Sequence, residues 1–324
     1  MKQLTQLQDA LGPELAEMNR IIARSLHTPN RLMNDIVSRY LQTKGKQIRP
    51  ILVLLAAKMF GNVSEDVLYA GAALEMLHNA SLIHDDVVDE TLLRRGVDTI
   101  NARLGNHIAV LVGDFFVSNA LAAGIHTGRI NVISALSDLG KELSLGEIYQ
   151  LDNARSHEFD EQSYIAMIRR KTASLFMHCV RMGAEVAGAP EELIPPLVRF
   201  AELLGLAFQI KDDIFDYFPN PQIGKPTGND LREGKVTLPL IHALAVAPEH
   251  IALPMRELLL RGELSDDEIA SLQKFARDFG GIEYAENYMV RLRDEAFSLI
   301  APFPDSTSKD ALISIFSYII SRDR

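Results

Sequence analysis

Apolar residues recur along most of the chain with a period near 3.6, the spacing that places them on one face of an α-helix. The segments 51–59, 74–83 and 203–214 show this pattern clearly, and together they are rich in Ala, Leu, Met and Glu, which are good helix formers. No segment alternates apolar and polar residues convincingly, as a half-buried strand would. The pattern therefore predicts an all-α protein.

Glycine and proline divide the chain into helical blocks. The blocks follow one another without a low-complexity linker and without an internal repeat. We therefore expect a single domain over residues 1–324, built as a bundle of many helices. The turn signals are Gly61-Asn62, Gly188-Ala189-Pro190, Pro219-Asn220-Pro221, Pro226-Thr227-Gly228-Asn229 and Pro302-Phe303-Pro304.

Composition excludes several classes of protein. The 324 residues are 47 % apolar and 23 % charged, an ordinary globular mix that is not typical of a disordered chain. The net charge of −10 argues against nucleic-acid binding, which needs a basic face. The single cysteine, Cys179, cannot form an internal disulfide, as expected in a reducing cytoplasm. The longest unbroken apolar run, Ile51–Ala57, is far shorter than the roughly 20 residues of a membrane span, so we expect no transmembrane segment and a cytoplasmic protein.

The pattern Asp-Asp-x-x-Asp occurs twice, at Asp85–Asp89 and Asp212–Asp216, each time after an apolar helical run. Residues i and i+4 of a helix lie on one face, so the first and last carboxylates of each cluster are neighbours. Two carboxylates at this spacing can hold one Mg²⁺, which prefers oxygen ligands and leaves positions for water and substrate phosphates. A solvated acidic helix face is the plainer interpretation of one cluster. Two clusters at the ends of apolar helices, where like charges repel, favour metal sites.

With these clusters the sequence resembles the trans-isoprenyl diphosphate synthases, or polyprenyl synthetases, nearly end to end. The resemblance implies a helical bundle in which the two clusters face each other across a central substrate cavity. It also implies three Mg²⁺ ions on the diphosphate of an allylic substrate. The metal ligands would be Asp85, Asp86, Asp89, Asp212, Asp213 and Asp216.

Basic residues of the N-terminal half match the diphosphate-binding residues of this family. Lys46 and Arg49 lie just before a helix that Pro50 can open at its first position, and a helix N-terminus suits an anion. The family usually has Gly-Gly-Lys here, and Lys44 replaces the first glycine. By resemblance Lys46, Arg49, His78 and Arg95 bind isopentenyl diphosphate, while Arg94 binds the allylic diphosphate. From the sequence pattern alone, we would expect His78 to be a structural residue of a helix.

A second group of matches lies in the C-terminal half. Lys171-Thr172 resembles the family's Lys-Thr pair, and Phe208-Gln209 its Phe-Gln pair. Lys225 and Lys235 stand in a segment rich in Gly and Pro, a composition typical of a loop that can close over a site. Arg322 and Arg324 resemble a basic tail. The residues expected to act in catalysis are Asp85, Asp89, Arg94, Lys171, Thr172, Gln209, Asp212 and Lys235.

The resemblance also bears on the length of the product. The growing chain would run along the helix before Asp85, where short-chain members of the family carry an aromatic residue. Ala80 and Ser81 are small, which favours a long-chain, octaprenyl-like product made from farnesyl or geranylgeranyl diphosphate. Residues that could end or line the channel are Met76, Leu77, Phe115, Phe116, Glu147 and Gln150.

Four alternatives remain open at this point. A short-chain farnesyl or geranylgeranyl diphosphate synthase differs only in the product. A class I terpene cyclase usually carries an Asn/Ser/Glu motif as its second metal cluster, and a non-catalytic subunit tends to lose the aspartates. A di-iron carboxylate protein needs a pair of Glu-x-x-His motifs on facing helices, and the sequence lacks such a pair. By resemblance, the protein is expected to be a homodimer.

Overall fold

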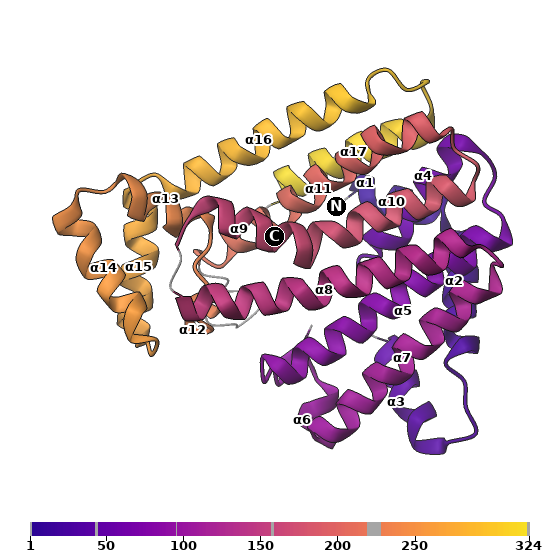
Figure 1. The fold of residues 1–324 in the computed structure, drawn as a ribbon, viewed down its shortest axis with the longest axis horizontal. Coiled ribbons are helices and arrows are strands. Elements are labelled where there is room, and N and C mark those ends of the chain that lie inside the picture. Colours follow the sequence, from indigo (N-terminus) through magenta and orange to yellow (C-terminus); the bar gives the residue numbers. More distant parts are fainter. Residues whose placement is uncertain (1, 43–44, 95, 157–158, 219–227, 323–324) are drawn as a thin grey trace. The chain divides into compact units, whose positions relative to one another are not determined.

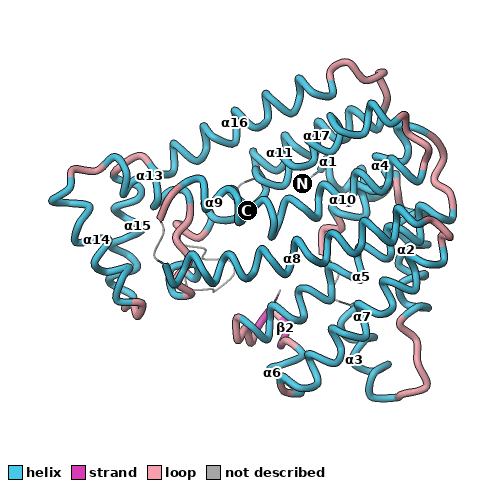
Figure 2. The backbone as a smooth tube through the Cα atoms, in the orientation of Figure 1, coloured by secondary structure: helices cyan, strands magenta, loops and turns pink. Residues whose placement is uncertain are grey.

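The computed structural model describes residues 2–42, 45–94, 96–156, 159–218 and 228–322, and nearly all of them are helical (Figure 1, Figure 2). The only strands in these ranges are β1 (Leu93–Arg94) and β2 (Val97–Asp98), which form one short antiparallel hairpin. The prediction of an all-α fold is therefore confirmed. The chain groups into two compact units. That it forms one domain around a central cavity stays a prediction.

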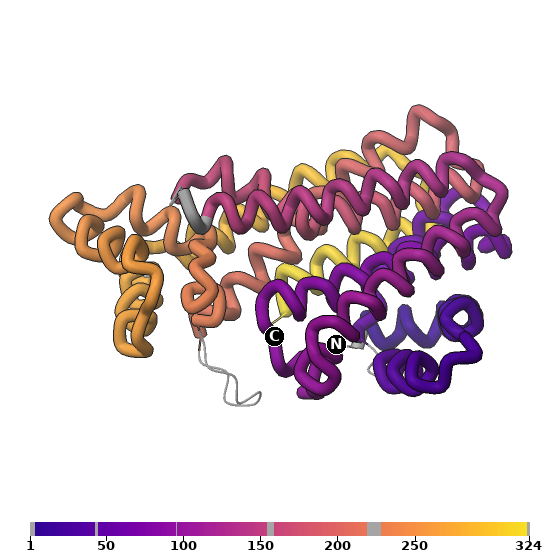
Figure 3. Tube along the Cα trace, turned by 60° about the horizontal axis from the view of Figure 1, so that its bottom comes forward, coloured from indigo at the N-terminus to yellow at the C-terminus, as the bar shows by residue number. Residues whose placement is uncertain are grey.

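The first unit comprises Met1–Lys141, Leu175–Val198 and Phe303–Ser314. Its long helix α5 packs along α7 and also contacts α2 and α4 (Figure 1, Figure 3). The apolar run Ile51–Ala57 of α4 is buried throughout, which makes α4 a core helix. The helices of this unit are α1 (Lys2–Ala10), α2 (Gly12–Ser25), α3 (Arg31–Gln42), α4 (Ile48–Phe60), α5 (Glu65–Val88), α6 (Ile100–Leu104), α7 (Asn106–His126), α10 (Ser174–Val186) and the 3₁₀ turn Glu191–Leu193, with parts of α8, α11 and α17.

The second unit comprises Glu142–Ser174, Arg199–Pro302 and Ile315–Arg324. In its core, α13 packs against α15 and α16, and a Cβ on Gly281 would lie only 2.0 Å from the carbonyl oxygen of Pro239. Only glycine therefore allows this approach of α16 to α13. Its elements are α8 (Ile130–Ser156), α9 (Glu161–Ile168), the π-helical turn Arg169–Ala173, α11 (Ile194–Phe215), α12 (Asn229–Arg232), α13 (Leu238–Val246), α14 (Glu249–Arg261), α15 (Asp266–Asp278), α16 (Gly281–Ile300) and α17 (Thr307–Ser321).

One local expectation was wrong. The helix after Lys46 begins at Ile48, so Arg49 lies inside it and Pro50 is its third residue and not its first. This position costs nothing, because the first four N–H groups of a helix have no intrahelical partner. Arg94 lies on the hairpin that follows α5, because α5 ends at Val88 and the chain turns back at Gly96, whose φ is +76°.

Two helical stretches, Asn106–His126 and Glu191–Phe215, are long and apolar enough to cross a membrane by length and composition alone. Core helices of water-soluble proteins pass the same test, and 39 % and 56 % of the two most apolar windows are buried. This is weak evidence for a membrane span. The absence of a transmembrane segment stays an expectation.

Candidate active site

The first acidic cluster forms the C-terminal end of α5. Asp85 lies in the last helical turn, and Asp89 is the residue that follows the helix, with its N–H donating to the carbonyl oxygen of Asp85 at 2.8 Å. The two residues are therefore one turn apart, as the i, i+4 spacing predicted. Both side chains are half-buried. Their hard carboxylate oxygens suit Mg²⁺.

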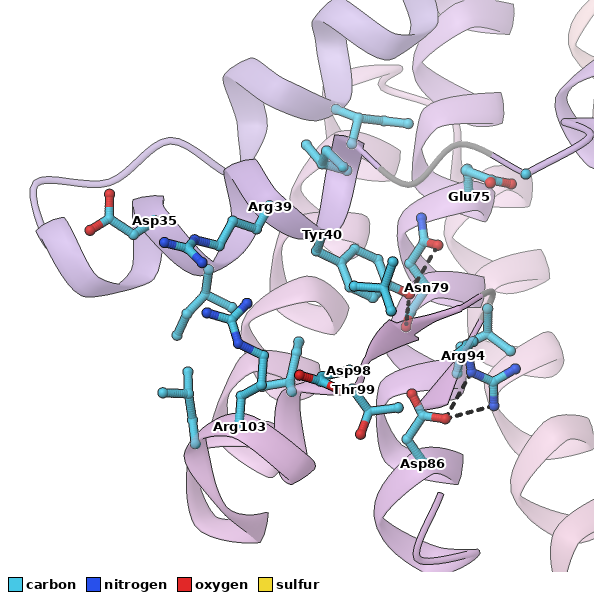
Figure 4. Close-up of a pocket in the computed structure, with 18 of the residues that line it drawn as sticks. Asp35, Arg39, Tyr40, Glu75, Asn79, Asp86, Arg94, Asp98, Thr99 and Arg103 are labelled. Carbon is cyan, nitrogen blue, oxygen red and sulfur yellow. Dashed lines mark hydrogen bonds and ion pairs between the residues drawn. The ribbon is translucent and has the colours of Figure 1, made fainter. Parts of the chain in front are cut away.

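The middle residue of this cluster, Asp86, is paired with an arginine. Arg94 on the hairpin donates from Nε at 2.8 Å and from Nη2 at 2.7 Å, both to Oδ1 of Asp86 (Figure 4). Burial raises the pKa of Asp86, and the ion pair with Arg94 opposes that rise. Arg94 therefore lies beside the first cluster, and its binding of the allylic diphosphate stays a prediction.

The basic residues before α4 have different surroundings. Lys46 is exposed, and the guanidinium of Arg49 lies 5.8 Å from the ring centroid of Phe176. Gln47 between them adopts a left-handed conformation, with a φ of 53°. His78 is buried in α5. Lys44 and Arg95 lie outside the described residues.

The residues predicted to set the product length are mostly core residues of the first unit. Met76, Leu77 and Ala80 are buried in α5, and the hydroxyl of half-buried Ser81 donates to the carbonyl oxygen of His78 at 2.9 Å. Phe116 is fully buried and packs edge-to-face on Tyr40, with ring centroids 5.5 Å apart. Phe115 is half-buried.

In the second unit, five of the residues predicted to act in catalysis or metal binding converge on one cavity of about 130 Å³. They come from the π-helical turn, from α11 and from the segment after α12, so distant parts of the sequence meet here. Its walls also include Gln150, Tyr164 and Asp230. The five are Lys171, Thr172, Gln209, Asp213 and Lys235.

The π-helical turn places Lys171 against α8. The Nζ atom of Lys171 lies 2.5 Å from Oε1 of Glu147 and 2.9 Å from Oε1 of Gln150. A Cβ on Gly146 would lie 2.8 Å from the backbone nitrogen of Lys171, so glycine permits this contact. Turns of π-helix often mark functional sites, and no sequence pattern indicated this one.

Asp213 sits at the centre of a buried hydrogen-bond network. Tyr164 donates its hydroxyl to Oδ2 at 2.5 Å, and Gln209 donates Nε2 to Oδ1 at 2.7 Å. Thr172 in turn donates to Oε1 of Gln209 at 2.6 Å. Burial raises the pKa of Asp213 to about 7, although both of its partners oppose the rise.

The last residue of the second cluster, Asp216, binds backbone instead of side chains. Its Oδ1 accepts the N–H groups of Gly228 and Asn229 at 3.1 Å each, and its Oδ2 accepts that of Asp230 at 3.0 Å. The carboxylate thus caps α12. Asp230 is itself half-buried, and desolvation together with Asp213 and Asp216 raises its pKa well above the ordinary value.

Arg322, near the C-terminus, pairs with the first residue of the same cluster. Its Nη2 lies 2.5 Å from Oδ1 of Asp212, and its guanidinium stacks over Phe208 and Phe215 at 4.6 and 5.3 Å. The sequence had indicated a basic tail without naming this partner. Arg324 and Lys225 lie outside the described residues.

Sequence reasoning missed the residues that hold others in place. Tyr164 and Asp230 belong to no motif, since a single tyrosine or a single aspartate in a helix is common. Their one signal is polarity at positions that pack inside. Among the described residues, no group of three or more His, Cys, Asp or Glu forms a preassembled metal site. That the two clusters face each other stays a prediction.

Comparisons with known proteins give one consistent result. The sequence model described as polyprenyl synthetase matches residues 30–275. The chain is 34 % identical over 323 residues to an octaprenyl diphosphate synthase of Haemophilus influenzae, covering 99 % of this chain and 97 % of that protein. A decaprenyl diphosphate synthase of Rhodobacter capsulatus has a TM-score of 0.93 at 31 % identity over 99 % of both chains. A geranylgeranyl pyrophosphate synthase of Bacteroides thetaiotaomicron has a TM-score of 0.86 at 35 % identity, covering 99 % of this chain and all of that one.

Proposed function

The chain belongs to the polyprenyl synthetase family, and from this premise we propose that it joins an allylic diphosphate to isopentenyl diphosphate in a Mg²⁺-dependent reaction. Membership agrees with the predicted resemblance and with an enzyme of the prenyltransferase class. The observation that carries the proposal is the cavity of the second unit. There Lys171, paired with Glu147, and Lys235, paired with Glu233, lie beside the polar side chains of Thr172 and Gln209.

The six aspartates of the two clusters are our candidates for the Mg²⁺ ligands. Four of them also accept hydrogen bonds or ion pairs within the protein: Asp86 from Arg94, Asp212 from Arg322, Asp213 from Tyr164 and Gln209, and Asp216 from the N-terminus of α12. When bound, Mg²⁺ would neutralise the charge that develops on the departing diphosphate.

The remaining residues divide the two substrates between them. Arg94, Lys171 and Lys235 would hold the allylic diphosphate, and Lys46, Arg49, His78 and Arg95 would hold isopentenyl diphosphate. Ionisation of the allylic C–O bond leaves a cationic carbon, which the double bond of isopentenyl diphosphate attacks before a proton is lost. Holding both substrates in place supplies much of the rate, because the reaction becomes effectively unimolecular. The released diphosphate can take the proton.

We propose a long-chain, all-trans product. The small buried side chain of Ala80 leaves the path along α5 without an aromatic block, and the relatives include octaprenyl and decaprenyl diphosphate synthases. The relatives also include a geranylgeranyl pyrophosphate synthase, so a shorter product is our second candidate.

We also propose that the protein is a cytoplasmic homodimer. Helix α7 exposes apolar side chains that a second copy could cover, namely Val110, Leu111, Leu121 and Ile125. A soluble dimer would remove this surface from water, where burial of apolar area is favourable.

The decisive experiment incubates the purified protein with Mg²⁺, farnesyl diphosphate and isopentenyl diphosphate, and sizes the product by chromatography. We expect one main product longer than 20 carbons, and none when EDTA is added. A product of 15 or 20 carbons would contradict the long-chain proposal alone. No condensation with any allylic primer would contradict the proposed function as a whole.

A further inference from the structure

We propose that Tyr164 is a positioning residue that acts through Asp213 and Gln209 to fix the direction of the hydrogen bond made by Thr172. As a result, Thr172 presents oxygen lone pairs to the cavity and not its hydroxyl hydrogen. This inference rests on the proposed function, since it concerns the cation formed during prenyl transfer. It assigns a role to a tyrosine that carries no motif.

The direction of each bond follows from the chemistry of the groups. Both oxygens of Asp213 receive a donor, the hydroxyl of Tyr164 on Oδ2 and the amide of Gln209 on Oδ1. An ionised carboxylate only accepts hydrogen bonds, so the NH₂ end of the amide has to face ionised Asp213. The opposite orientation would place two acceptor oxygens 2.7 Å apart in a buried site. The carbonyl end of Gln209 is thereby turned toward Thr172.

The last step concerns the hydroxyl of Thr172. A carbonyl oxygen only accepts, so Thr172 must donate its single hydrogen to Oε1 of Gln209 at 2.6 Å. What remains on Oγ1 are its two lone pairs, and Thr172 borders the cavity together with Lys171 and Lys235. A preorganised acceptor stabilises positive charge that develops in the transition state, whereas a hydroxyl hydrogen at the same place would repel it.

Tyr164 supplies the donor that holds Asp213 from the far side. Its ring belongs to α9, one helix before the π-helical turn, and only 2 % of the residue is exposed. Without its hydroxyl, Oδ2 of Asp213 loses this donor, and the carboxylate is free to rotate. The amide of Gln209 then loses the contact that sets its orientation, and the hydroxyl of Thr172 is no longer committed to one direction.

A double-mutant cycle tests this chain of contacts. We expect Tyr164→Phe to lower kcat by roughly 10- to 100-fold, as loss of such supporting contacts commonly does, with KM for isopentenyl diphosphate unchanged. Thr172→Val removes the acceptor. Adding Tyr164→Phe to this variant should then lower kcat by less than about twofold more, because the effects of mutations in one network are not additive. Thr172→Ser keeps the hydroxyl, and in that background Tyr164→Phe should again lower kcat by roughly 10- to 100-fold.

The matched control is Tyr217→Phe. Tyr217 is an equally buried tyrosine of the same unit, but its hydroxyl bonds to the hydroxyl of Thr237 at 2.9 Å. We expect its kcat to stay within about twofold of the wild type, since its hydroxyl is no part of the Asp213 network. Thermal melting of every variant shows which are folded, and Gln209→Met, of similar length, replaces Tyr164→Phe in the cycle if the latter is unfolded.

The outcomes separate this inference from the function on which it rests. A wild-type protein without condensing activity would defeat the proposed function. If the wild type is active and the losses of kcat caused by Tyr164→Phe and Thr172→Val simply multiply in the double mutant, the proposed role of Tyr164 is overturned. The same conclusion holds if Tyr164→Phe changes only KM, or if Tyr217→Phe loses as much kcat.

Discussion

At the scale of single residues, the three aspartates of the second cluster do three different things. Asp212 pairs with Arg322, Asp213 accepts bonds from Tyr164 and Gln209, and Asp216 caps α12. The repeated motif therefore does not mean repeated roles. The partners decide what each carboxylate can bind.

The ion pair of Arg322 predicts a competition with metal. Arg322→Gln removes the guanidinium that neutralises Asp212, so Mg²⁺ should bind the diphosphate-free protein about tenfold more tightly, a gain of about 1.4 kcal/mol. Isothermal titration with Mg²⁺ alone measures this directly. Arg277→Gln is the control, since Arg277 donates to a backbone oxygen at 2.8 Å and faces no cluster carboxylate in that contact. Equal Mg²⁺ affinity of Arg322→Gln and wild type would contradict the prediction.

The raised pKa of Asp213 predicts a pH dependence of stability without metal. The unfolded carboxyl loses its proton near its ordinary pKa of about 4, whereas the folded one keeps it up to about 7. Between these values the folded state binds more protons, so this group lowers the free energy of unfolding as pH rises. In EDTA, melting from about pH 4.5 to about pH 7.5 should show a steeper decline for wild type than for Asp213→Asn. Parallel curves would argue against this assignment.

Sequence reasoning succeeded at this scale where a residue belongs to a spaced motif. Lys171, Thr172, Gln209 and Lys235 were all predicted and line one cavity. Tyr164 could not be predicted, because its importance comes from a contact with a residue 49 positions away. Such a contact exists only after folding.

At the scale of elements, the close approach of α8 to the π-helical turn positions Lys171. The fit depends on Gly146, which has no side chain to separate them. The helices themselves could be predicted, because apolar residues spaced near 3.6 stay on one helix face over many turns. The hairpin and the π-helical turn have too few residues to set a period of their own, so they were missed.

Gly146→Ala should therefore harm the site through the backbone. A methyl group would meet the nitrogen and Cα of Lys171 at 2.8 and 2.9 Å, so one element has to move. We expect a loss of about 1–3 kcal/mol of stability, typical of overpacking, and a drop of roughly tenfold in kcat/KM. Gly140→Ala on the same helix meets nothing within 4 Å and is the control for both measurements. A fully active, stable Gly146→Ala protein would show that the approach is unimportant.

At the scale of the whole molecule, our proposal of a long product rests on space along α5. Ala80 is buried in this helix about 1.4 turns before Asp85, so its side chain has neighbours that a larger one would displace. Family and fold class were predictable from the two Asp-rich motifs and the helical period. The division of the chain into two compact units was not, because neither signal describes how separate helices pack.

Ala80→Phe should shorten the product if the channel follows α5. We expect a main product of roughly 15 to 20 carbons, because an aromatic ring blocks the path one turn below the first cluster. Chromatography of the dephosphorylated products gives the distribution. Ser81→Ala, which adds no volume, should leave it unchanged. A full-length product from a folded, active Ala80→Phe enzyme would move the channel elsewhere.

The cap made by Asp216 has one more consequence. Asp216 directly follows α11, and its carboxylate binds the N–H groups of Gly228 and Asn229, so it connects the two ends of the stretch 217–227. Because these contacts fix the position of Gly228 and Asn229, the residues that follow keep their place whatever the length of the chain in between. Doubling the length of a loop costs only about 0.6 kcal/mol. Insertions between Pro219 and Pro226 should therefore leave Lys235 in its place, while they would change the chain around Lys225, a predicted site residue.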